Sequence, residues 1–270
     1  MWDILTKSCI GASFMTVFSQ EEIDQLASNM ESQTPQQIIT WAVETFSPQI
    51  SVSSSFQAQS VPLLHMVSRI DPEILVFFLD TGLHFWETLM FRERLQREFG
   101  LHIQNLYLDK QWKNFIERFG RKLYDQDPDL CCYIRKVQPM QKAMQTVRAW
   151  ISGIRRDQTA NRHNAKILEL ERDGLLKINP LLNWTRQDVQ NYTLEHNLPI
   201  HPLFEKGYRS IGCKPCTRAV RQDEDERAGR WSGKGKTECG LHTEMFNQDG
   251  PGKSALLNGF LLNPNQDENQ

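Results

Sequence analysis

The sequence lacks any uninterrupted apolar stretch of the roughly 18 residues that a membrane span requires. Its start, MWDILTKSCIGASFMTVF, carries Asp3 before Lys7 and has no basic beginning, so no signal peptide is expected. An excess of one charge is also missing, because 31 Lys and Arg face 33 Asp and Glu for a net charge of −2. We therefore predict a cytoplasmic protein with neither nucleic acid nor a membrane surface as its partner.

Cysteine is scarce as well, since six cysteines in 270 residues are too few for a secreted disulfide scaffold. Two common phosphate-binding loops are absent: the chain has neither GxxxxGK[ST] nor the Gly-Gly-x-Asp arrangement of ATP pyrophosphatases. Hydrophobic residues are nevertheless plentiful, at 39%, which excludes disorder of the whole chain and allows a large core.

Segments with strand and helix character alternate along most of the chain. Short apolar runs predict strands at 49–52, 74–79, 103–108, 149–153 and 176–178. Helical periodicity lies between them, and Thr34-Pro35 and Thr185 are typical helix starts. This alternation predicts an α/β fold, a mainly parallel sheet flanked by helices, with ligands at the carboxyl ends of the strands.

The composition changes near residue 212, after which charged residues and glycine dominate. We predict an N-terminal extension over 1–33, a folded domain over 34–217 and a flexible C-terminal segment over 218–270. The last segment is expected to be a mobile tail and not a second core.

Four cysteines form two pairs: the adjacent Cys131 and Cys132, and Cys213 and Cys216 in a CxxC. Four thiolates are the usual complement of a 4Fe–4S cluster or of a structural zinc. An adjacent pair suits several metal atoms better than one, but zinc and buried or disulfide-bonded cysteines remain alternatives.

Two cysteines stand alone. Cys239 lies in a glycine-rich segment, KGKTECGLH, where Lys236 and His242 could favour its thiolate as in a nucleophile. The alternative is an ordinary surface cysteine in a tail. Cys9 has no such neighbours, and no function is expected for it.

Candidate anion-binding groups follow the predicted strands. The serine loop Ser53-Ser54-Ser55 offers hydroxyl and N–H donors at a helix start. Arg155, Arg156 and Arg162 match the planar oxygens of phosphate or sulfate, although a solvated loop paired with Asp157 is the alternative. Lys136 is either a helix-surface residue or a cation bridging a cluster and an anionic substrate.

Taken together, seven segments resemble the phosphoadenylyl/adenylyl sulfate reductase family, in family order over roughly residues 35–245. They are SSSF (53–56), LDTGLHFWET (79–88), CCYIRKVQPM (131–140), WISGIRRDQTANR (150–162), INPLLNWTRQDV (178–189), GYRSIGCKPCTRAV (207–220) and ECGLH (238–242). The combination of CC, CxxC and ECGLH is highly specific, and it is closest to the iron–sulfur-containing assimilatory adenylyl sulfate reductases.

The resemblance implies an adenine-nucleotide α-hydrolase-like fold and a reductase domain over 34–217. The Cys239 thiolate would attack the sulfuryl sulfur of adenylyl sulfate (adenosine 5′-phosphosulfate), releasing AMP and leaving an S-sulfocysteine. Thioredoxin or a similar dithiol protein would then release sulfite. The implied cluster ligands, for one 4Fe–4S cluster, are Cys131, Cys132, Cys213 and Cys216. The implied substrate-binding residues are Ser53, Ser54, Ser55, Asp80, Thr81, Gly82, Lys136, Arg155, Arg156 and Arg162.

The family also implies that the cluster supports substrate binding and does not pass electrons. A homo-oligomer is possible.

One departure from the family pattern concerns which nucleotide is the substrate. Many cluster-bearing relatives have a Gly-Ala-Glu-Asp type of loop where this chain has Ser54-Ser55-Phe56-Gln57. The serine-rich loop is more typical of enzymes that use 3′-phosphoadenylyl sulfate, so that substrate, or use of both, is the first alternative.

Two rivals come from other classes. A cluster-bearing thiol redox sensor would bind nucleotide and oxidise Cys239 without forming sulfite. A tRNA-thiolating enzyme of related fold is disfavoured by the net charge of −2 and by the missing ATP-type loop.

Overall fold

The computed structural model describes residues 18–119, 122–248, 250 and 254–262. Cys9 and the first half of the predicted N-terminal extension lie outside these residues. The longer helices and the strands, in chain order, are α1 (Gln20–Met30), α2 (Pro35–Phe46), β1 (Ile50–Ser53), α3 (Val61–Ile70), β2 (Leu75–Asp80), α4 (Trp86–Phe99), β3 (His102–Tyr107), α5 (Lys113–Phe119), α6 (Leu123–Gln126), α7 (Pro128–Cys132), α8 (Gln138–Met144), β4 (Ala149–Ile151), β5 (Leu168–Leu170), β6 (Leu176–Ile178), α9 (Arg186–Glu195) and α10 (Ala255–Leu262). Within the described ranges, no helix has the length and apolar character needed to cross a bilayer.

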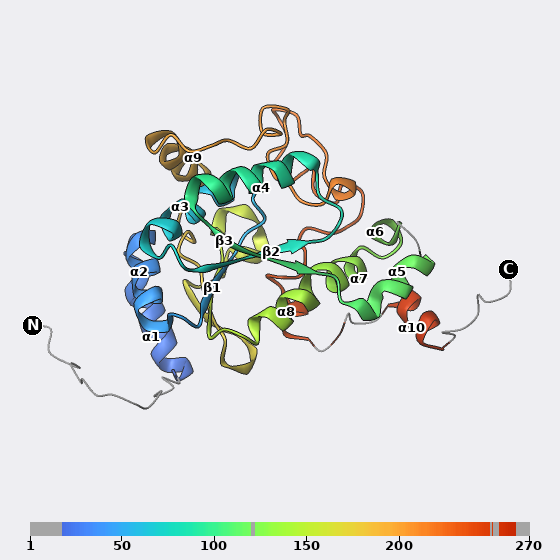
Figure 1. Cartoon of the computed structure of the whole chain (residues 1–270), viewed down its shortest axis with the longest axis horizontal. Coiled ribbons are helices and arrows are strands. Elements are labelled where there is room, and N and C mark those ends of the chain that lie inside the picture. Colours follow the sequence, from blue (N-terminus) through green and yellow to red (C-terminus); the bar gives the residue numbers. More distant parts are fainter. Residues whose placement is uncertain (1–17, 120–121, 249, 251–253, 263–270) are drawn as a thin grey trace, which may run out of the picture.

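The six strands form one sheet in the order β3-β2-β1-β4-β6-β5, and every pair is parallel except β5–β6. The predicted α/β fold with a mainly parallel sheet is confirmed (Figure 1). Only β5 (Leu168–Leu170) was not predicted from the sequence. It is a partly buried strand at the edge of the sheet, whereas the equally short β4 and β6 lie inside the sheet and are buried along their whole length. The chain runs outward from β1 to β3 and then returns to β4 beside β1, so the crevice between the ends of β1 and β4 is a topological switch point.

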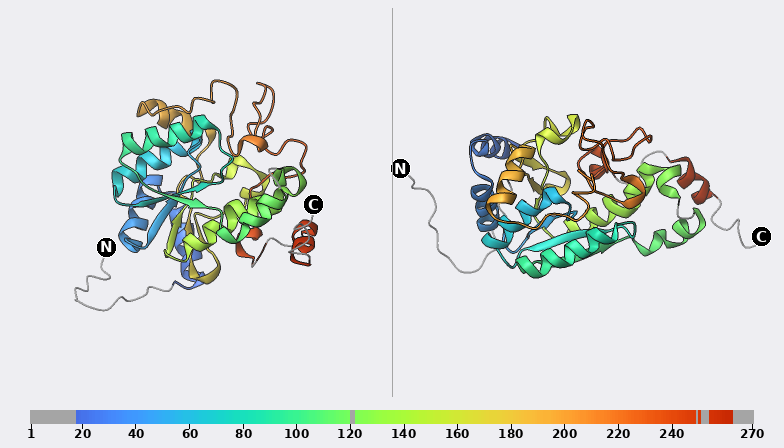
Figure 2. Two further views of the ribbon diagram at one scale, coloured as in Figure 1. Left: turned by 45° about the vertical axis from the view of Figure 1, so that its right-hand side comes forward. Right: turned by 90° about the horizontal axis from the view of Figure 1, so that it is seen from above.

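Side chains alternate across the sheet and separate two layers of core. In β4, Ala149 and Ile151 point into the core that is shared with helices α1 to α4 and α9. Trp150 points to the opposite face, where it packs with residues of α7, α8 and the C-terminal segment. The two groups of helices lie on opposite sides of the sheet in Figures 1 and 2.

Local signals explain where the helices begin. At α2 the Thr34 side chain accepts a hydrogen bond from the Gln37 N–H, and Pro35 occupies the first turn. Thr185 caps α9 in the same way through Asp188. Both starts were predicted, because a cap is a short-range interaction that the local sequence specifies.

The C-terminal segment folds back over the carboxyl ends of the strands (Figure 2). Leu241, Phe246 and Leu257 are buried in the same core as Trp150, so this segment adds to an existing core and does not form its own. Its flexibility and the proposed domain boundaries remain predictions.

Candidate active site

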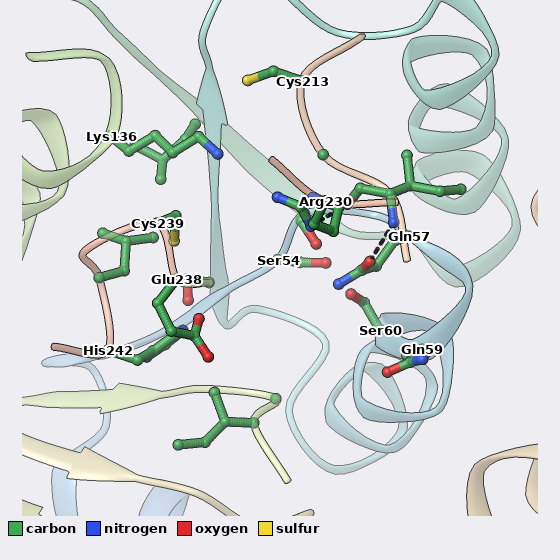
Figure 3. A pocket seen from close by; sticks show the side chains of 18 of the residues that line it. Ser54, Gln57, Gln59, Ser60, Lys136, Cys213, Arg230, Glu238, Cys239 and His242 are labelled. Atoms are coloured by element: carbon green, nitrogen blue, oxygen red, sulfur yellow. Dashed lines mark hydrogen bonds between the residues drawn. The ribbon is translucent and has the colours of Figure 1, made fainter. Parts of the chain in front are cut away.

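A pocket opens at the switch point between β1 and β4. Its floor is the serine loop after β1, and its other walls come from the segments around Cys213, Arg230 and Cys239. Figure 3 shows Ser54, Lys136, Arg230 and Cys239 arranged around the same space. The fold therefore joins segments that are up to about 190 residues apart in the sequence.

The serine loop is held rigidly against the sheet. Ser54 donates its backbone N–H to the Phe77 carbonyl at 3.0 Å, and its Oγ accepts the N–H of Phe56 at 3.0 Å. Phe56 adopts a left-handed φ of 52° and is fully buried against Phe78. A phenylalanine in this conformation is uncommon, and its burial keeps the loop in one shape. Ser53, Ser54 and Ser55 all line the pocket, and their role in binding substrate stays a prediction.

Four cations line the pocket: Lys136, Arg162, Arg227 and Arg230. Glu238 is the one carboxylate among its described lining residues. Burial, together with the nearby Arg162 guanidinium, lowers the pKa of Arg227 to about 10. A pKa lowered in this way means that the cations repel one another and lack sufficient counter-charge, so the pocket favours an anionic ligand.

Cys239 is half-buried and projects into this cationic pocket (Figure 3). Burial opposes its ionisation, but the charge of Lys136, the N–H of Leu241 and the charge of Arg162 outweigh burial, so the pKa of the Cys239 thiol is lowered. The sequence analysis expected Lys236 and His242 to have this effect. Instead, Lys236 is paired with Asp129, and burial keeps the pKa of His242 well below its ordinary value, so His242 is neutral.

The Cys239 thiol should therefore titrate at a lower pH than an ordinary cysteine. Alkylation by iodoacetamide, followed on the Cys239 peptide by mass spectrometry, is expected to rise with pH with a midpoint below that of a reference cysteine peptide. Lys136→Gln removes the largest favourable charge and should move the midpoint to higher pH. A midpoint at or above that of the peptide, or one unmoved by Lys136→Gln, would contradict this electrostatic account.

Lys136 is positioned by an unusual helical turn. The chain continues from α7 through a π-helical turn, Tyr133–Val137, into α8. Such turns are rare and frequent at functional sites. Lys136 lines both the pocket and a second, smaller cavity, so it lies between them. Burial opposes its charge, yet the negative charge that Cys213, Cys239 and Cys132 carry as thiolates outweighs burial and raises the pKa of Lys136, which keeps it protonated.

The second cavity is lined by all four paired cysteines. Cys131, Cys132, Cys213 and Cys216 come together there although the two pairs are about eighty residues apart in the sequence, and all four are free thiols. Burial, with the repulsion of neighbouring thiols, raises the pKa of Cys131 to about 12. In the described part of the chain, no three His, Cys, Asp or Glu side chains converge as ligands of a single metal ion.

Two of the predicted arginines do not reach the pocket. Arg155 is buried, with its Nε 2.9 Å from Asp157 Oδ1 and its Nη1 2.8 Å from Gln59 Oε1. Arg156 points away from the pocket and pairs with Glu31 after α1, at 2.7 Å from Nη2 to Oε1. Consecutive residues diverge in direction, so a run of two arginines could not deliver both groups to one site.

The segment after β2, which was expected to bind the substrate through Asp80, Thr81 and Gly82, lines the pocket with other residues. Its Leu79 and His84 line the pocket, whereas Asp80, Thr81 and Gly82 do not. Thr81 lies instead at the cysteine cavity, with its Oγ1 3.3 Å from the Sγ of Cys213. The Asp80 side chain accepts the N–H of Gly82 and so shapes the turn.

The sequence motifs do not indicate Arg227 and Arg230, which line the pocket and come from the charged segment predicted to be a mobile tail. Gly212 is the sequence feature that could have indicated Arg230. A Cβ at Gly212 would lie 2.3 Å from Arg230 Nη2, so only glycine lets the guanidinium pack there. Gln57, in the serine loop, accepts the N–H of Ile211 at 3.0 Å and fastens this segment to the loop.

Comparisons with known proteins agree on one family. The profile of the phosphoadenosine phosphosulfate reductase domain matches residues 49–219. A protein of Streptomyces coelicolor named adenosine 5′-phosphosulfate reductase is 41% identical over 227 residues, covering 82% of this chain and 95% of that protein. Adenosine 5′-phosphosulfate reductase 2 of Bacillus subtilis is 39% identical over 230 residues, with coverages of 84% and 95%. A Gloeobacter violaceus protein named phosphoadenosine 5′-phosphosulfate reductase is 39% identical over 229 residues, with coverages of 83% and 94%.

Comparison with solved structures also finds a reductase of this family. The phosphoadenylyl-sulfate reductase of Candida auris, solved as a phosphate complex, superimposes with a TM-score of 0.63 at 30% identity, covering 75% of this chain and 98% of that one. The FMN adenylyltransferase of Candida glabrata, at a TM-score of 0.50 and 16% identity, shares the fold alone; the match covers 78% of this chain and 71% of that one.

Proposed function

Because the chain belongs to the phosphoadenosine phosphosulfate reductase family, we propose that it reduces adenosine 5′-phosphosulfate to sulfite and AMP. The observation that carries the proposal is the placement of Cys239, a thiol of lowered pKa, in a pocket walled by four cations. A nucleophilic sulfur next to an anion-binding site is what attack on a phosphosulfate requires. The names of relatives from Streptomyces, Salinibacter and Bacillus support this substrate.

The proposed reaction has two steps. The Cys239 thiolate attacks the sulfuryl sulfur, the bond from that sulfur to the bridging oxygen breaks, and AMP leaves with the electron pair. A dithiol protein, thioredoxin or similar, then attacks Cys239 Sγ through one thiolate, and sulfite leaves with the electron pair of the sulfur–sulfur bond. The second thiol of the reductant resolves the mixed disulfide, so the dithiol supplies both electrons and Cys239 is regenerated.

Residues of this chain favour the first step by position and charge. The serine loop, Lys136 and Arg230 hold the anionic group beside Cys239, and they stabilise the charge that develops on the leaving phosphate oxygen. Arg155 and Arg156, which lie outside the pocket, would contribute only to the surrounding structure.

We further propose that Cys131, Cys132, Cys213 and Cys216 hold one 4Fe–4S cluster in the cavity that they line. A cubane takes one thiolate at each iron corner, so its ligands are spread around a cavity and do not converge on one ion. Two other groups lining this cavity, Arg135 and Arg230, have buried Nε–H donors without a partner among the described residues. Anionic sulfur atoms in the cavity would accept from them. When bound, the cluster would supply a fixed electrostatic environment beside Lys136.

The test is mass spectrometry of anaerobically purified protein mixed with adenosine 5′-phosphosulfate in the absence of reductant. We expect a sulfonate adduct on the Cys239 peptide, which thioredoxin then releases as sulfite. No adduct from protein that carries its cluster would reject this substrate.

The serine loop and the names of the Gloeobacter and Candida auris relatives favour 3′-phosphoadenylyl sulfate as a second candidate substrate. The same sample is therefore tested with 3′-phosphoadenylyl sulfate. An adduct from this nucleotide alone would make the chain a 3′-phosphoadenylyl sulfate reductase, and adducts from both would make it a dual-substrate enzyme. Adducts from neither would favour a thiol redox sensor.

A further inference from the structure

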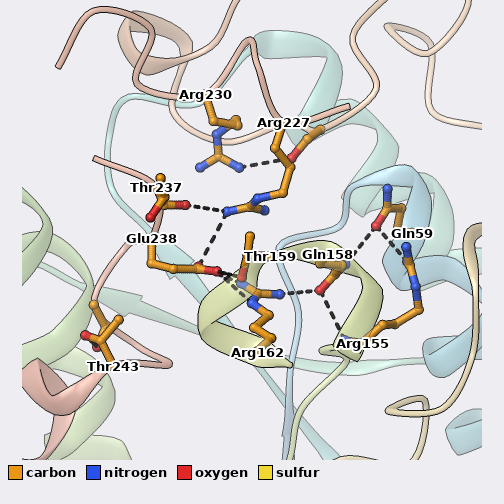
Figure 4. A network of polar contacts seen from close by, with 12 residues as sticks. Gln59, Arg155, Gln158, Thr159, Arg162, Arg227, Arg230, Thr237, Glu238 and Thr243 are labelled. Carbon is orange, nitrogen blue, oxygen red and sulfur yellow. Dashed lines mark hydrogen bonds and ion pairs between the residues drawn. The ribbon is translucent and has the colours of Figure 1, made fainter. Parts of the chain in front are cut away.

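Arg162 lines the pocket, but each of its three guanidinium nitrogens already donates to a protein acceptor. Its Nε lies 2.8 Å from Glu238 Oε1 and its Nη2 lies 2.7 Å from Glu238 Oε2, a bidentate ion pair. The remaining Nη1 donates to Gln158 Oε1. Figure 4 shows this network, in which the guanidinium faces the carboxylate. A cation held in this way has little capacity left for an external anion.

Glu238 is the centre of the network. Its side chain is only 3% exposed, and it also accepts from Thr159 Oγ1 at 2.8 Å and from Arg227 Nη2 at 3.4 Å. Donors from two separate segments of the chain, 159–162 and the one around Arg227, thus converge on one carboxylate. A buried carboxylate with several donors is strongly localised, so the backbone that carries it is localised as well.

Cys239 is the next residue in the chain. It is followed by Gly240 at a φ of +92°, where a Cβ would lie 2.5 Å from Met245 Sδ. The reactive thiol is therefore held between a fixed side chain on one side and a tight glycine turn on the other.

The other cations of the pocket are differently placed. Arg230 lies over the Trp231 ring, 4.3 Å from its centroid, and makes only long hydrogen bonds, 3.4 Å to Ser210 Oγ and 3.3 Å to the Ile211 carbonyl. Its buried Nε has no hydrogen-bond partner among the described residues. No carboxylate pairs with Arg230 or with Lys136 in the described part of the chain. These two are the cations left for a ligand.

We propose that Arg162 and Glu238 form a clamp that positions Cys239 over the pocket, and that Arg162 is a positioning residue and not a ligand of the substrate. The sequence-based expectation placed Arg162 among the substrate-binding residues. The inference rests on the proposed function for the reaction that the clamp serves, but the clamp itself can be measured without that reaction.

Glu238 could act on Cys239 through its charge or by fixing the position of the thiol, and the two roles predict opposite effects of Glu238→Gln on the rate of attack. The negative charge of Glu238 raises the pKa of Cys239, so Glu238→Gln should increase the thiolate fraction. If Glu238 acted only through charge, Glu238→Gln would speed up attack on the substrate. If the clamp positions the thiol, Glu238→Gln slows the attack, and so does Arg162→Lys, which keeps its charge but loses the bidentate geometry.

The experiment compares Arg162→Lys and Glu238→Gln, each as the full chain with its cluster, with the matched surface pair Arg94→Lys and Glu98→Gln. Three quantities are measured: the Kd of adenosine 5′-phosphosulfate in a Cys239→Ser background, the rate of S-sulfocysteine formation at saturating nucleotide, and the rate of Cys239 alkylation without nucleotide. Thermal melting checks that each variant folds. Thr159→Val, which removes one hydrogen bond to Glu238, is a milder variant if the others do not fold.

We expect Kd to stay within about twofold, S-sulfocysteine formation to slow by about tenfold or more, and Cys239 alkylation to rise several-fold as the segment loosens. The surface pair should change none of these. A Kd weakened about tenfold by Arg162→Lys, with an unchanged rate at saturation, would make Arg162 a substrate ligand and overturn the proposal. Unchanged alkylation in both clamp variants would also overturn it. If the unmodified chain forms no adduct, the proposed function fails, and the alkylation rate of Arg162→Lys, which keeps its positive charge, alone decides on the clamp.

Discussion

Replacing Cys239 with serine is expected to abolish the formation of sulfite. A serine hydroxyl is not ionised near neutral pH and cannot take the place of a thiolate of lowered pKa, so the turnover rate should fall by roughly 10⁴-fold or more. The measurement is sulfite release from adenosine 5′-phosphosulfate with thioredoxin as the reductant. Because the four cations of the pocket are untouched, the nucleotide should still bind to the variant.

Binding is therefore the control for this variant. An unchanged Kd together with lost turnover would place Cys239 in the chemical step. Sulfite formation at the rate of the unmodified chain would show that another group is the nucleophile, and the proposed mechanism would be rejected.

Replacing Cys213 with serine is expected to remove the cluster. The iron content should fall from about four atoms per chain toward zero, because a hydroxyl is a poor ligand for iron in a cubane. The visible absorption should disappear with it, and both are measured on anaerobically purified protein. Sulfite formation should fall as well, since Lys136 would lose the environment on its cluster-facing side.

Cys9 provides the matched comparison, because its sequence neighbours contain no other metal-binding group. Cys9→Ser should keep its iron and its activity. Iron retained at about four atoms per chain in Cys213→Ser would contradict the proposed ligand set, whatever the activity.

The position of Lys136 connects the two cavities. It faces Cys239 and the nucleotide pocket on one side and the paired cysteines on the other. Cys132 and Lys136 are four residues apart, so a helical segment presents both on the same side. This proximity explains why the charge of Lys136 helps to lower the pKa of Cys239 and partly offsets the burial that raises the pKa of Cys132 to about 11.

Much of the fold could be predicted because it depends on short-range patterns. The run at 74–79 is apolar throughout because β2 is central and has a core on each face. The caps at Thr34 and Thr185 need only residues three positions away. By contrast, β5 pairs on one side only, at the edge of the sheet, and is only partly buried, so its own sequence lacks the continuous apolar character of an inner strand.

The site was predictable only in part. Motif spacing indicated Cys239, Lys136 and the serine loop, and each lines the pocket. The same motifs suggested Arg156, which pairs with Glu31 outside the pocket, and could not indicate Arg230, whose role depends on a long return of the chain. Residue type shows what a side chain can bind, but its direction depends on how distant segments pack.

The sequence by itself determined the alternation that produces a parallel sheet, and the family, because periodicity and short motifs are local properties. Only the tertiary structure decided which cations surround Cys239, that Glu238 takes up the donors of Arg162, and that two cysteine pairs line one cavity. The physical reason is the switch point of the sheet, where the strand order reverses and the loops after β1 and β4 face each other. Side chains from widely separated segments meet in that crevice, and their mutual burial and charge set the pKa values on which the chemistry depends.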